Sequence, residues 1–262
     1  MQPRVRHLVA VVLTAGCACA AAACTTAPAE RDQSAVSSLA IAAPVRPDPR
    51  IGALFPGDGT VHTCSASVLD TPGADLILTA AHCLAGHPDA TFVPGLTEGA
   101  ADDGIRVQAV YLDPRWLSDQ DPRADFAILR LDAAVPAAGR GVTVGAAPRA
   151  GTAVTVEGYA GGEGVTPIGC RAPTELVVGF PELPCAGLVA GMSGAPWIVG
   201  STVVGLIGGL DGGGCDDDLS YSPPFDAAIT DLLARAQAGG NGDVAPVADD
   251  DGCSAELTPG TG

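Results

Sequence analysis

Three side chains of this 262-residue chain are of types that together perform nucleophilic chemistry, and each stands in a distinctive setting. His82 ends the sequence Thr-Ala-Ala-His, which follows an apolar run at residues 76–78. Asp125 directly precedes another apolar run, and Ser193 lies in the sequence Gly-Met-Ser-Gly-Ala-Pro. A histidine, a carboxylate and a serine in settings of this kind indicate one hydrolytic site.

A serine hydroxyl is a weak nucleophile at neutral pH, so it needs a base within hydrogen-bond reach to accept its proton. A neutral imidazole suits this task because its pKa lies near neutral pH. A buried carboxylate then holds the imidazole in the right tautomer and stabilises the imidazolium. We therefore predict Ser193 as the nucleophile, His82 as the general base and then acid, and Asp125 as the orienting carboxylate. Asp121 and Asp113 are the alternatives for the last role.

The segments around these residues, 79–83, 125–131 and 191–196, resemble those of the trypsin/chymotrypsin-like serine peptidases, most closely the secreted bacterial branch. The chain order histidine, aspartate, serine is that of chymotrypsin-like proteases and differs from the order in subtilisins and α/β-hydrolases. The resemblance covers about residues 51–237. It implies a serine endopeptidase that hydrolyses peptide bonds through an acyl-enzyme on Ser193.

The resemblance also implies an all-β, chymotrypsin-like fold of two six-stranded antiparallel Greek-key barrels with a C-terminal helix. The first barrel would carry His82 and Asp125, the second Ser193, and the site would lie in the cleft between them. Short apolar runs divided by Gly, Pro and Asp from residue 51 onward separately indicate antiparallel sheet rather than βαβ units. The glycine-rich segment 158–164 lacks the ending of a phosphate-binding loop, so it predicts a turn between strands.

One helix is expected near the C-terminus. Asp226 can cap it, and apolar residues recur on one face of residues 227–236. By resemblance, this helix packs back onto the second barrel. The following residues, 238–262, form an acidic tail rich in Gly, Asp and Pro, which predicts disorder unless Cys253 anchors it.

By resemblance, the backbone N–H groups of Gly191 and Ser193 form the oxyanion hole, which stabilises the charge of the tetrahedral intermediate. In animal trypsins an aspartate precedes the nucleophile and pairs with a new N-terminal amine after zymogen cleavage. Met192 occupies that position here and cannot bind an ammonium group. We therefore expect the oxyanion hole to form without cleavage, although Arg50-Ile51 looks like a trypsin activation site.

Substrate preference depends on the pocket for the side chain before the scissile bond, P1. Trypsin-like enzymes carry an acidic residue six positions before the nucleophile, where this chain has Gly187, so no carboxylate is present there to bind Arg or Lys. The expected pocket wall, residues 204–210, is also uncharged. We therefore predict a neutral or apolar P1 residue, with nearby Asp211 as the group that could change this preference. Ala195 replaces the family's usual glycine and adds a methyl group close to the site.

The composition limits the partners. Apolar residues make up 47% of the chain, enough for a full core, and the net charge is −17. Such acidity argues against binding to nucleic acid or to anionic membranes. We expect a polypeptide substrate, a monomer, and neither a cofactor nor a metal.

The N-terminus predicts export. Residues 1–23 carry two arginines, an apolar run and then small residues, as a secretory signal does. Cys17 and Cys24 each follow a small-residue sequence that resembles an imperfect lipoprotein signal. Two outcomes stay open: release as a secreted protein, or extracytoplasmic attachment to the cell surface through an N-terminal lipid. Residues 24–50 predict a linker or short pro-segment.

Three of the nine cysteines lie at or before residue 24, and the other six are Cys64, Cys83, Cys170, Cys185, Cys215 and Cys253. An even number in an exported chain indicates disulfides, and no Cys-x-x-Cys spacing suggests a metal site. The family resemblance implies Cys64–Cys83, which ties the histidine loop. Cys170–Cys185 is favoured over the family-like alternative Cys185–Cys215, and it leaves Cys215 to pair with Cys253.

Two other functions remain open from the sequence. One is a catalytically silent protein of the same fold that binds a peptide or a partner. The other is an esterase that uses the same three side chains. A fluorophosphonate probe and a comparison of ester with peptide substrates separate these alternatives from an endopeptidase.

Overall fold

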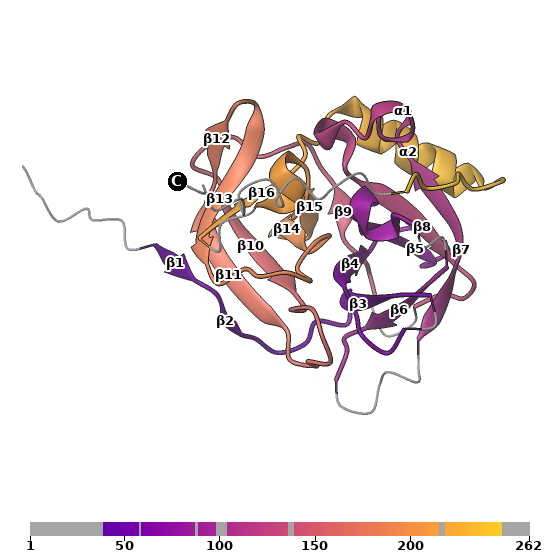
Figure 1. Ribbon diagram of the computed structural model, residues 1–262, viewed down its shortest axis with the longest axis horizontal. Coiled ribbons are helices and arrows are strands. Elements are labelled where there is room, and N and C mark those ends of the chain that lie inside the picture. The colour runs from indigo at the N-terminus through magenta and orange to yellow at the C-terminus, as the bar shows by residue number, and fades with distance from the viewer. Residues whose placement is uncertain are drawn as a thin grey trace, which may run out of the picture. The chain divides into compact units, whose positions relative to one another are not determined.

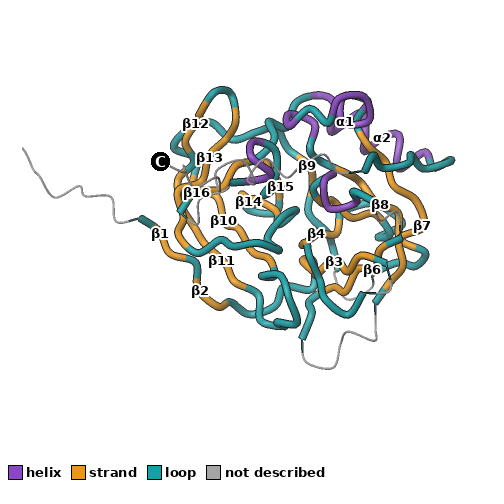
Figure 2. The backbone as a smooth tube through the Cα atoms, viewed as in Figure 1, coloured by secondary structure: helices purple, strands orange, loops and turns teal. Residues whose placement is uncertain are grey.

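The structure is a computed structural model that describes residues 39–57, 59–86, 89–97, 104–135, 139–214 and 218–247 (Figure 1). Most of its elements are strands: β1 (Ala40–Ile41), β2 (Ala43–Pro44), β3 (Ile51–Pro56), β4 (Cys64–Val68), β5 (Leu76–Thr79), β6 (Ala90–Pro94), β7 (Ile105–Leu112), β8 (Ala127–Leu131), β9 (Thr143–Val144), β10 (Ala153–Gly158), β11 (Ile168–Pro173), β12 (Glu175–Val177), β13 (Phe180–Ala186), β14 (Pro196–Val199), β15 (Thr202–Leu206) and β16 (Leu219–Tyr221). The α-helices of these ranges are α1 (Pro114–Asp119) and α2 (Ala227–Ala238). Figure 2 shows strands throughout both halves of this part of the chain, so the all-β prediction is confirmed.

The first half forms a closed barrel. Strands β3, β4, β5, β8, β7 and β6 hydrogen-bond to one another in that order, and every pairing is antiparallel. Closure removes the exposed strand edges that would otherwise invite association. The interior is fully buried and contains Ile77, Phe92 and Leu129. The structure therefore confirms the first predicted six-stranded barrel.

The second half is built from two sheets rather than one closed barrel. A six-stranded sheet has the order β2-β11-β10-β14-β15-β9, and a four-stranded sheet pairs β13 with β1, β12 and β16. Two of the pairings, β1 with β13 and β15 with β9, are parallel. These involve two-residue strands that the sequence pattern does not reveal, because a two-residue strand shows no alternation. Both sheets cover a core around Trp197, Leu183 and Val156.

The C-terminal helix α2 forms as predicted but packs on a different surface. Asp226 caps it by accepting a hydrogen bond from the Ala228 backbone at 2.8 Å. Its apolar face, with Ile229 and Leu232, contacts strands β7 and β8 of the first barrel. The prediction that it packs onto the second barrel is therefore wrong. Leu76 and Ile128 of the first barrel belong to the same apolar cluster, together with Leu206 of β15. Figure 1 shows α2 beside the first barrel.

Residues before the first barrel belong to the second half. Strand β1 pairs with β13 at Cys185 and Ala186, and β2 pairs with β11. The Ala42 N–H donates to the Ala186 carbonyl at 2.8 Å. Residues 40–44, expected in the linker or pro-segment, thus extend both sheets of the second half.

Residues beyond α2 are also held in place. The Asp243 N–H donates to the Val110 carbonyl at 2.7 Å, and the Asp243 carboxylate accepts from the Leu112 N–H at 2.8 Å. Arg235 forms an ion pair with the same carboxylate at 2.6 Å. Burial disfavours the charged form of Asp243, but these hydrogen bonds and the Arg235 charge outweigh it and lower its pKa. These contacts therefore hold the chain beyond α2 against β7 at Asp243.

Both predicted disulfides are present, Cys64–Cys83 and Cys170–Cys185. The second joins β11 to β13 and so ties the two sheets of the second half together. Because Cys185 is bonded to Cys170, the alternative pair Cys185–Cys215 is excluded. The other cysteine predictions fall outside the described residues; they concern Cys215, Cys253, Cys17 and Cys24. Among the helices that the structure describes, none is long and apolar enough to cross a membrane.

Removal of the second disulfide tests its contribution to stability. We expect the double substitution Cys170→Ala and Cys185→Ala to lower the free energy of unfolding by roughly 3 kcal/mol, because the bond closes a loop of 15 residues in the unfolded chain. Urea denaturation followed by tryptophan fluorescence measures the change. An unchanged denaturation midpoint would contradict the expectation.

Candidate active site

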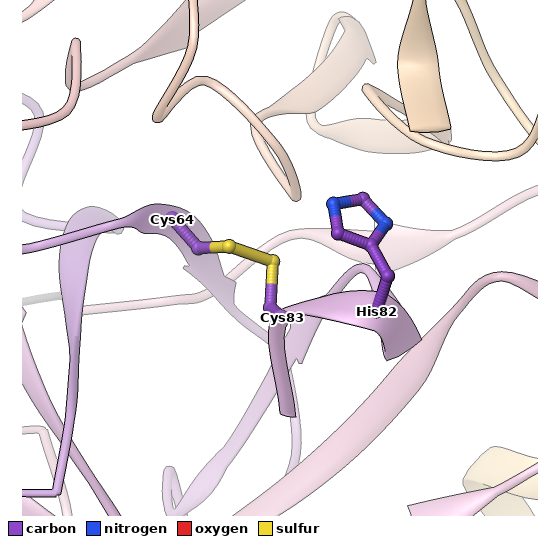
Figure 3. Close-up of side chains that lie close together, drawn as sticks. All are labelled: Cys64, His82 and Cys83. Carbon is purple, nitrogen blue, oxygen red and sulfur yellow. A yellow bond between two sulfur atoms is a disulfide. The ribbon is translucent and has the colours of Figure 1, made fainter. Parts of the chain in front are cut away.

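His82 leaves the first barrel at the end of a buried strand. Strand β5 ends at Thr79, and His82 lies in the 3-10 helix Ala81–Leu84 that follows. The Cys64–Cys83 disulfide anchors this turn to β4, and Figure 3 shows the imidazole pointing away from the turn beside that bond. The His82 side chain is 29% exposed, so one side of the ring is accessible to a ligand.

Asp125 reaches His82 because their strands are neighbours. It lies two residues before β8, which pairs with β5 so that Ala127 stands opposite Thr79. Its carboxylate lies 2.7 Å from Nδ1 of His82 and accepts from the His82 backbone N–H at 2.9 Å. A third donor, the Gly209 backbone N–H, lies at 2.7 Å. The carboxylate thus fixes both the ring and the backbone of His82.

The electrostatics of this pair follow from burial and contact. The Asp125 side chain is only 2% exposed. Burial works against its ionisation, but the charge of the neighbouring His82 and the three hydrogen bonds outweigh it, so the pKa of Asp125 lies below its ordinary value. A carboxylate that stays ionised keeps the Nδ1 position of the ring as a donor.

The two alternative aspartates have other partners. Asp113 caps α1 by accepting from the Arg115 backbone N–H at 2.8 Å and also binds the Arg115 guanidinium. Asp121 caps the 3-10 helix that precedes Asp125 by accepting from the Arg123 backbone N–H at 2.9 Å. Among the three candidates, Asp125 is the residue that the structure brings to His82.

Ser193 lies on a turn of the second half that packs directly against the first barrel. Its carbonyl accepts from the Ser65 N–H of β4 at 2.7 Å. Gly194 has a φ of 80°, and a Cβ there would lie 2.2 Å from the Thr79 hydroxyl oxygen, so only glycine allows this approach. Thr79 stands three residues before His82. The turn therefore brings Ser193 to the end of the strand that carries the histidine.

The contact between serine and histidine is looser than that between histidine and aspartate. The Ser193 hydroxyl forms no hydrogen bond with any residue that the structure describes. Catalytic hydrogen bonds are often long or poorly aligned in unliganded sites and shorten only with a ligand bound. The structure thus forms the Asp125–His82 pair and brings Ser193 to the same junction without a His82–Ser193 hydrogen bond.

The turn around Ser193 presents backbone donors. The N–H groups of Met192, Gly194 and Ala195 bind carbonyls of Val189, Ile207 and Met192, respectively. The N–H groups of Gly191 and Ser193 have no acceptor among the described residues. Two donors beside a serine hydroxyl are the arrangement that an oxyanion hole requires.

Met192 is fully buried in the apolar core of the second half. The Arg50–Ile51 bond lies at the start of β3, where the Arg50 carbonyl accepts from Val68 N–H at 2.8 Å and Ile51 is buried. The uncut chain therefore holds Arg50 within a hydrogen-bonded barrel, and an apolar side chain occupies the position of the family's aspartate.

The residues predicted to form the P1 pocket are apolar where the structure describes them. Gly187 has a φ of 84°, and the atom nearest to a Cβ built there is the Cβ of Ala42 at 3.7 Å. Leu206 and Ile207 are buried, whereas Asp211 is exposed. Ala42 belongs to the segment between β1 and β2, so residues that the sequence analysis placed in a linker lie beside the predicted pocket.

One cluster has the composition of a metal site but not its chemistry. Ligand atoms of Cys64, Cys83 and His82 lie within 4.8 Å of one another. The two sulfur atoms are joined in a disulfide, as Figure 3 shows, and cannot act as thiolates. The cluster is therefore a brace for the histidine turn.

Sequence analysis missed two contributors to the site. Gly209 supplies the third donor to Asp125, and a Cβ at its neighbour Gly208 would lie 2.9 Å from the Asp125 carboxylate. Ser65 supports the serine turn from β4. The glycines at 208 and 209 were the available signal for the Gly209 donor. No pattern in the sequence marks Ser65.

Part of the chain matches a known protein family. Residues 44–169 match the trypsin family; this range includes His82 and Asp125 and ends before Ser193. No curated protein sequence matches the chain.

Solved structures show the same fold. The protease Anisep from Arthrobacter nicotinovorans is 21% identical, with a TM-score of 0.64 over 76% of this chain and 100% of that one. A thermostable serine protease from an extremophilic microorganism is 18% identical, with a TM-score of 0.61 over 74% and 99%. An inactivated protease paralogue of the scabies mite is 17% identical, with a TM-score of 0.58 over 75% and 98%. The solved structures thus show a chymotrypsin-like fold for this chain, and residues 44–169 within it match the trypsin family.

Proposed function

We propose that the protein is a serine endopeptidase that acts through an acyl-enzyme on Ser193. The observation that carries this proposal is the buried Asp125 carboxylate, which binds both Nδ1 and the backbone N–H of His82. A buried charge is costly, and its pairing with a partly exposed imidazole beside a serine turn is hard to explain as a contribution to stability alone.

The chemistry follows from the atoms in place. Nε2 of His82 accepts the proton of the Ser193 hydroxyl as the oxygen attacks the substrate carbonyl. The N–H groups of Gly191 and Ser193 bind the oxyanion that forms. The intermediate collapses when His82 returns the proton to the leaving amine, and water then hydrolyses the acyl-enzyme by the same steps. Asp125 stays ionised throughout and stabilises the imidazolium.

The alternative functions follow from the fold. A mite protein of the same fold is described as an inactivated protease paralogue, so the fold by itself does not fix activity. A binding protein would need neither the Asp125–His82 pair nor the two backbone donors. An esterase would use the same groups, and substrates distinguish it. We further propose that the protein is a monomer that is exported, either secreted or attached through an N-terminal lipid; its two disulfides support export.

A fluorophosphonate probe tests the nucleophile. We expect the full chain to be labelled on Ser193 while its Arg50–Ile51 bond is intact, because Met192 leaves no ion pair for cleavage to create. Mass spectrometry of the labelled protein identifies both the modified residue and the intact bond. Ser193→Ala should abolish labelling. Folded protein that stays unlabelled would favour the binding role. Labelling only after cleavage behind Arg50 would contradict the prediction that the active site forms in the uncut chain.

Asp125→Asn tests the orienting carboxylate. We expect kcat to fall about 10⁴-fold with little change in KM, because an amide that donates to Nδ1 favours the wrong tautomer of His82. Steady-state assays on a peptide ester measure both constants. Asp121→Asn is the matched control, since Asn can still cap the 3-10 helix, and it should keep most of the activity.

Asp125→Asn should also change how the stability of the protein depends on pH. The pKa of Asp125 is lowered in the folded state, so its ionised form adds stability above the unfolded pKa of about 4. That contribution is lost as the pH falls through the lower, folded value. Urea unfolding at several acidic pH values should therefore show a weaker pH dependence for Asp125→Asn than for the wild type.

A peptide library tests the P1 preference. We expect cleavage after neutral or apolar residues, because Gly187 places no carboxylate at the base of the predicted pocket and its described neighbours are apolar. Asp211→Asn should leave the preference unchanged. A profile dominated by Arg and Lys would overturn the pocket assignment without affecting the nucleophile.

A further inference from the structure

The peptide groups on both sides of Gly191 are each held by a hydrogen bond. The Ala190 carbonyl accepts from the Gly161 N–H at 2.7 Å. The Gly191 carbonyl accepts from the Ser65 hydroxyl at 3.2 Å. A trans peptide is planar, and its N–H points opposite to its C=O. Fixing the Ala190 carbonyl therefore also fixes the direction of the Gly191 N–H.

Ser65 is the centre of this arrangement. It is fully buried in β4, next to the Cys64–Cys83 disulfide. Besides donating to Gly191, its hydroxyl accepts from the Tyr159 N–H at 2.9 Å. Its backbone N–H donates to the Ser193 carbonyl at 2.7 Å. One residue of the first barrel thus holds the carbonyls of both residues whose N–H groups form the proposed oxyanion hole.

The second support comes from the loop after β10. Gly161 lies against Gly191 so closely that a Cβ at Gly191 would sit 1.9 Å from the Gly161 nitrogen. His62 holds this loop: it exchanges backbone hydrogen bonds with Gly162, and its Nε2 donates to the Gly164 carbonyl at 2.8 Å. The Gly161 donor is therefore anchored to the first barrel as well.

The turn needs such support. Gly191 has a φ of 92°, which glycine adopts with little cost, and its peptide groups can also rotate to other orientations. The neighbouring Met192 is apolar and buried, so no charged group of its own fixes the turn.

We infer that Ser65 is a positioning residue of the active site: its hydroxyl fixes the peptide that follows Gly191, while the Gly161 N–H fixes the peptide that carries the Gly191 N–H, and the two contacts together hold that N–H in the orientation that binds an oxyanion. The inference rests on the proposed function. It assigns to a neutral hydrogen bond from β4 the task of preforming the oxyanion hole in the uncut chain. Ser65 itself touches neither the substrate nor the reacting atoms.

Ser65→Ala tests the inference, with Ser67→Ala as its matched control. Ser67 is equally buried in the same strand, but its hydroxyl has no hydrogen-bond partner in the part of the chain that the structure describes. We expect Ser65→Ala to slow fluorophosphonate labelling of Ser193 by about ten- to a hundredfold, less than the 10²–10³ that follows deletion of a donor, because the Gly191 N–H is still present but Gly191 is then held on one side only. Ser67→Ala should react like the wild type.

A second readout separates positioning from stability. On a peptide ester, Ser65→Ala should lower kcat and weaken a peptide boronate, which forms a tetrahedral adduct, by similar factors while KM stays the same. A general loss of structure would also change KM and the thermal midpoint. If Ser65→Ala does not fold, Ser65→Cys replaces it, because the thiol fills the site but donates weakly.

The outcomes are distinct. A wild-type protein that does not react ends both the proposed function and this inference. A reactive wild type with unchanged labelling, kcat and boronate affinity in a folded Ser65 variant overturns the inference alone. Equal slowing by Ser65→Ala and Ser67→Ala would also overturn it, because the effect would then come from loss of buried volume in β4.

Discussion

The junction between the two halves of the structure depends on one buried carboxylate, that of Asp125, which needs hydrogen-bond partners. Asp125 is 2% exposed and is satisfied by the His82 ring, the His82 backbone and the Gly209 backbone. An ionised group at such a depth is stable only when charge and hydrogen bonds replace its lost hydration. Two of these donors come from the first barrel and the third from the second half. Satisfying one charge therefore fixes the histidine and joins the two halves at the same point.

Close backbone contact completes that junction. The serine turn lies on β4 and β5 without an intervening side chain, because a Cβ at Gly194 would overlap the Ser65 carbonyl and the Thr79 hydroxyl. Gly208 leaves similar room beside the Asp125 carboxylate. Protein interiors transmit small displacements because they are densely packed. The position of Ser193 is therefore set by the first barrel, although the turn that carries it belongs to the second half.

The sequence predicted what local patterns encode and missed what tertiary contacts decide. His82 and Asp125 lie at the ends of apolar strands, and the pairing of β5 with β8 brings them together as expected. Helix α2 was recognisable from its cap and its apolar face, yet the surface it covers depends on the outside of the first barrel. Contributions from backbone N–H groups, such as that of Gly209, leave no signature in side-chain type. The buried hydroxyl of Ser65 is equally silent, because its partners lie more than ninety residues away in the chain.

The replacement of a charge by Met192 changes what can control the site. An ion pair at that position depends on a free amine and on its ionisation, so it can act as a switch. The contacts that hold the turn here join the Ser65 hydroxyl and the Gly161 N–H to carbonyls, and none of these groups titrates in the physiological range. Their strength is accordingly insensitive to pH and to cleavage of the chain. Control of such a site falls to access of substrate to the Ser193 turn.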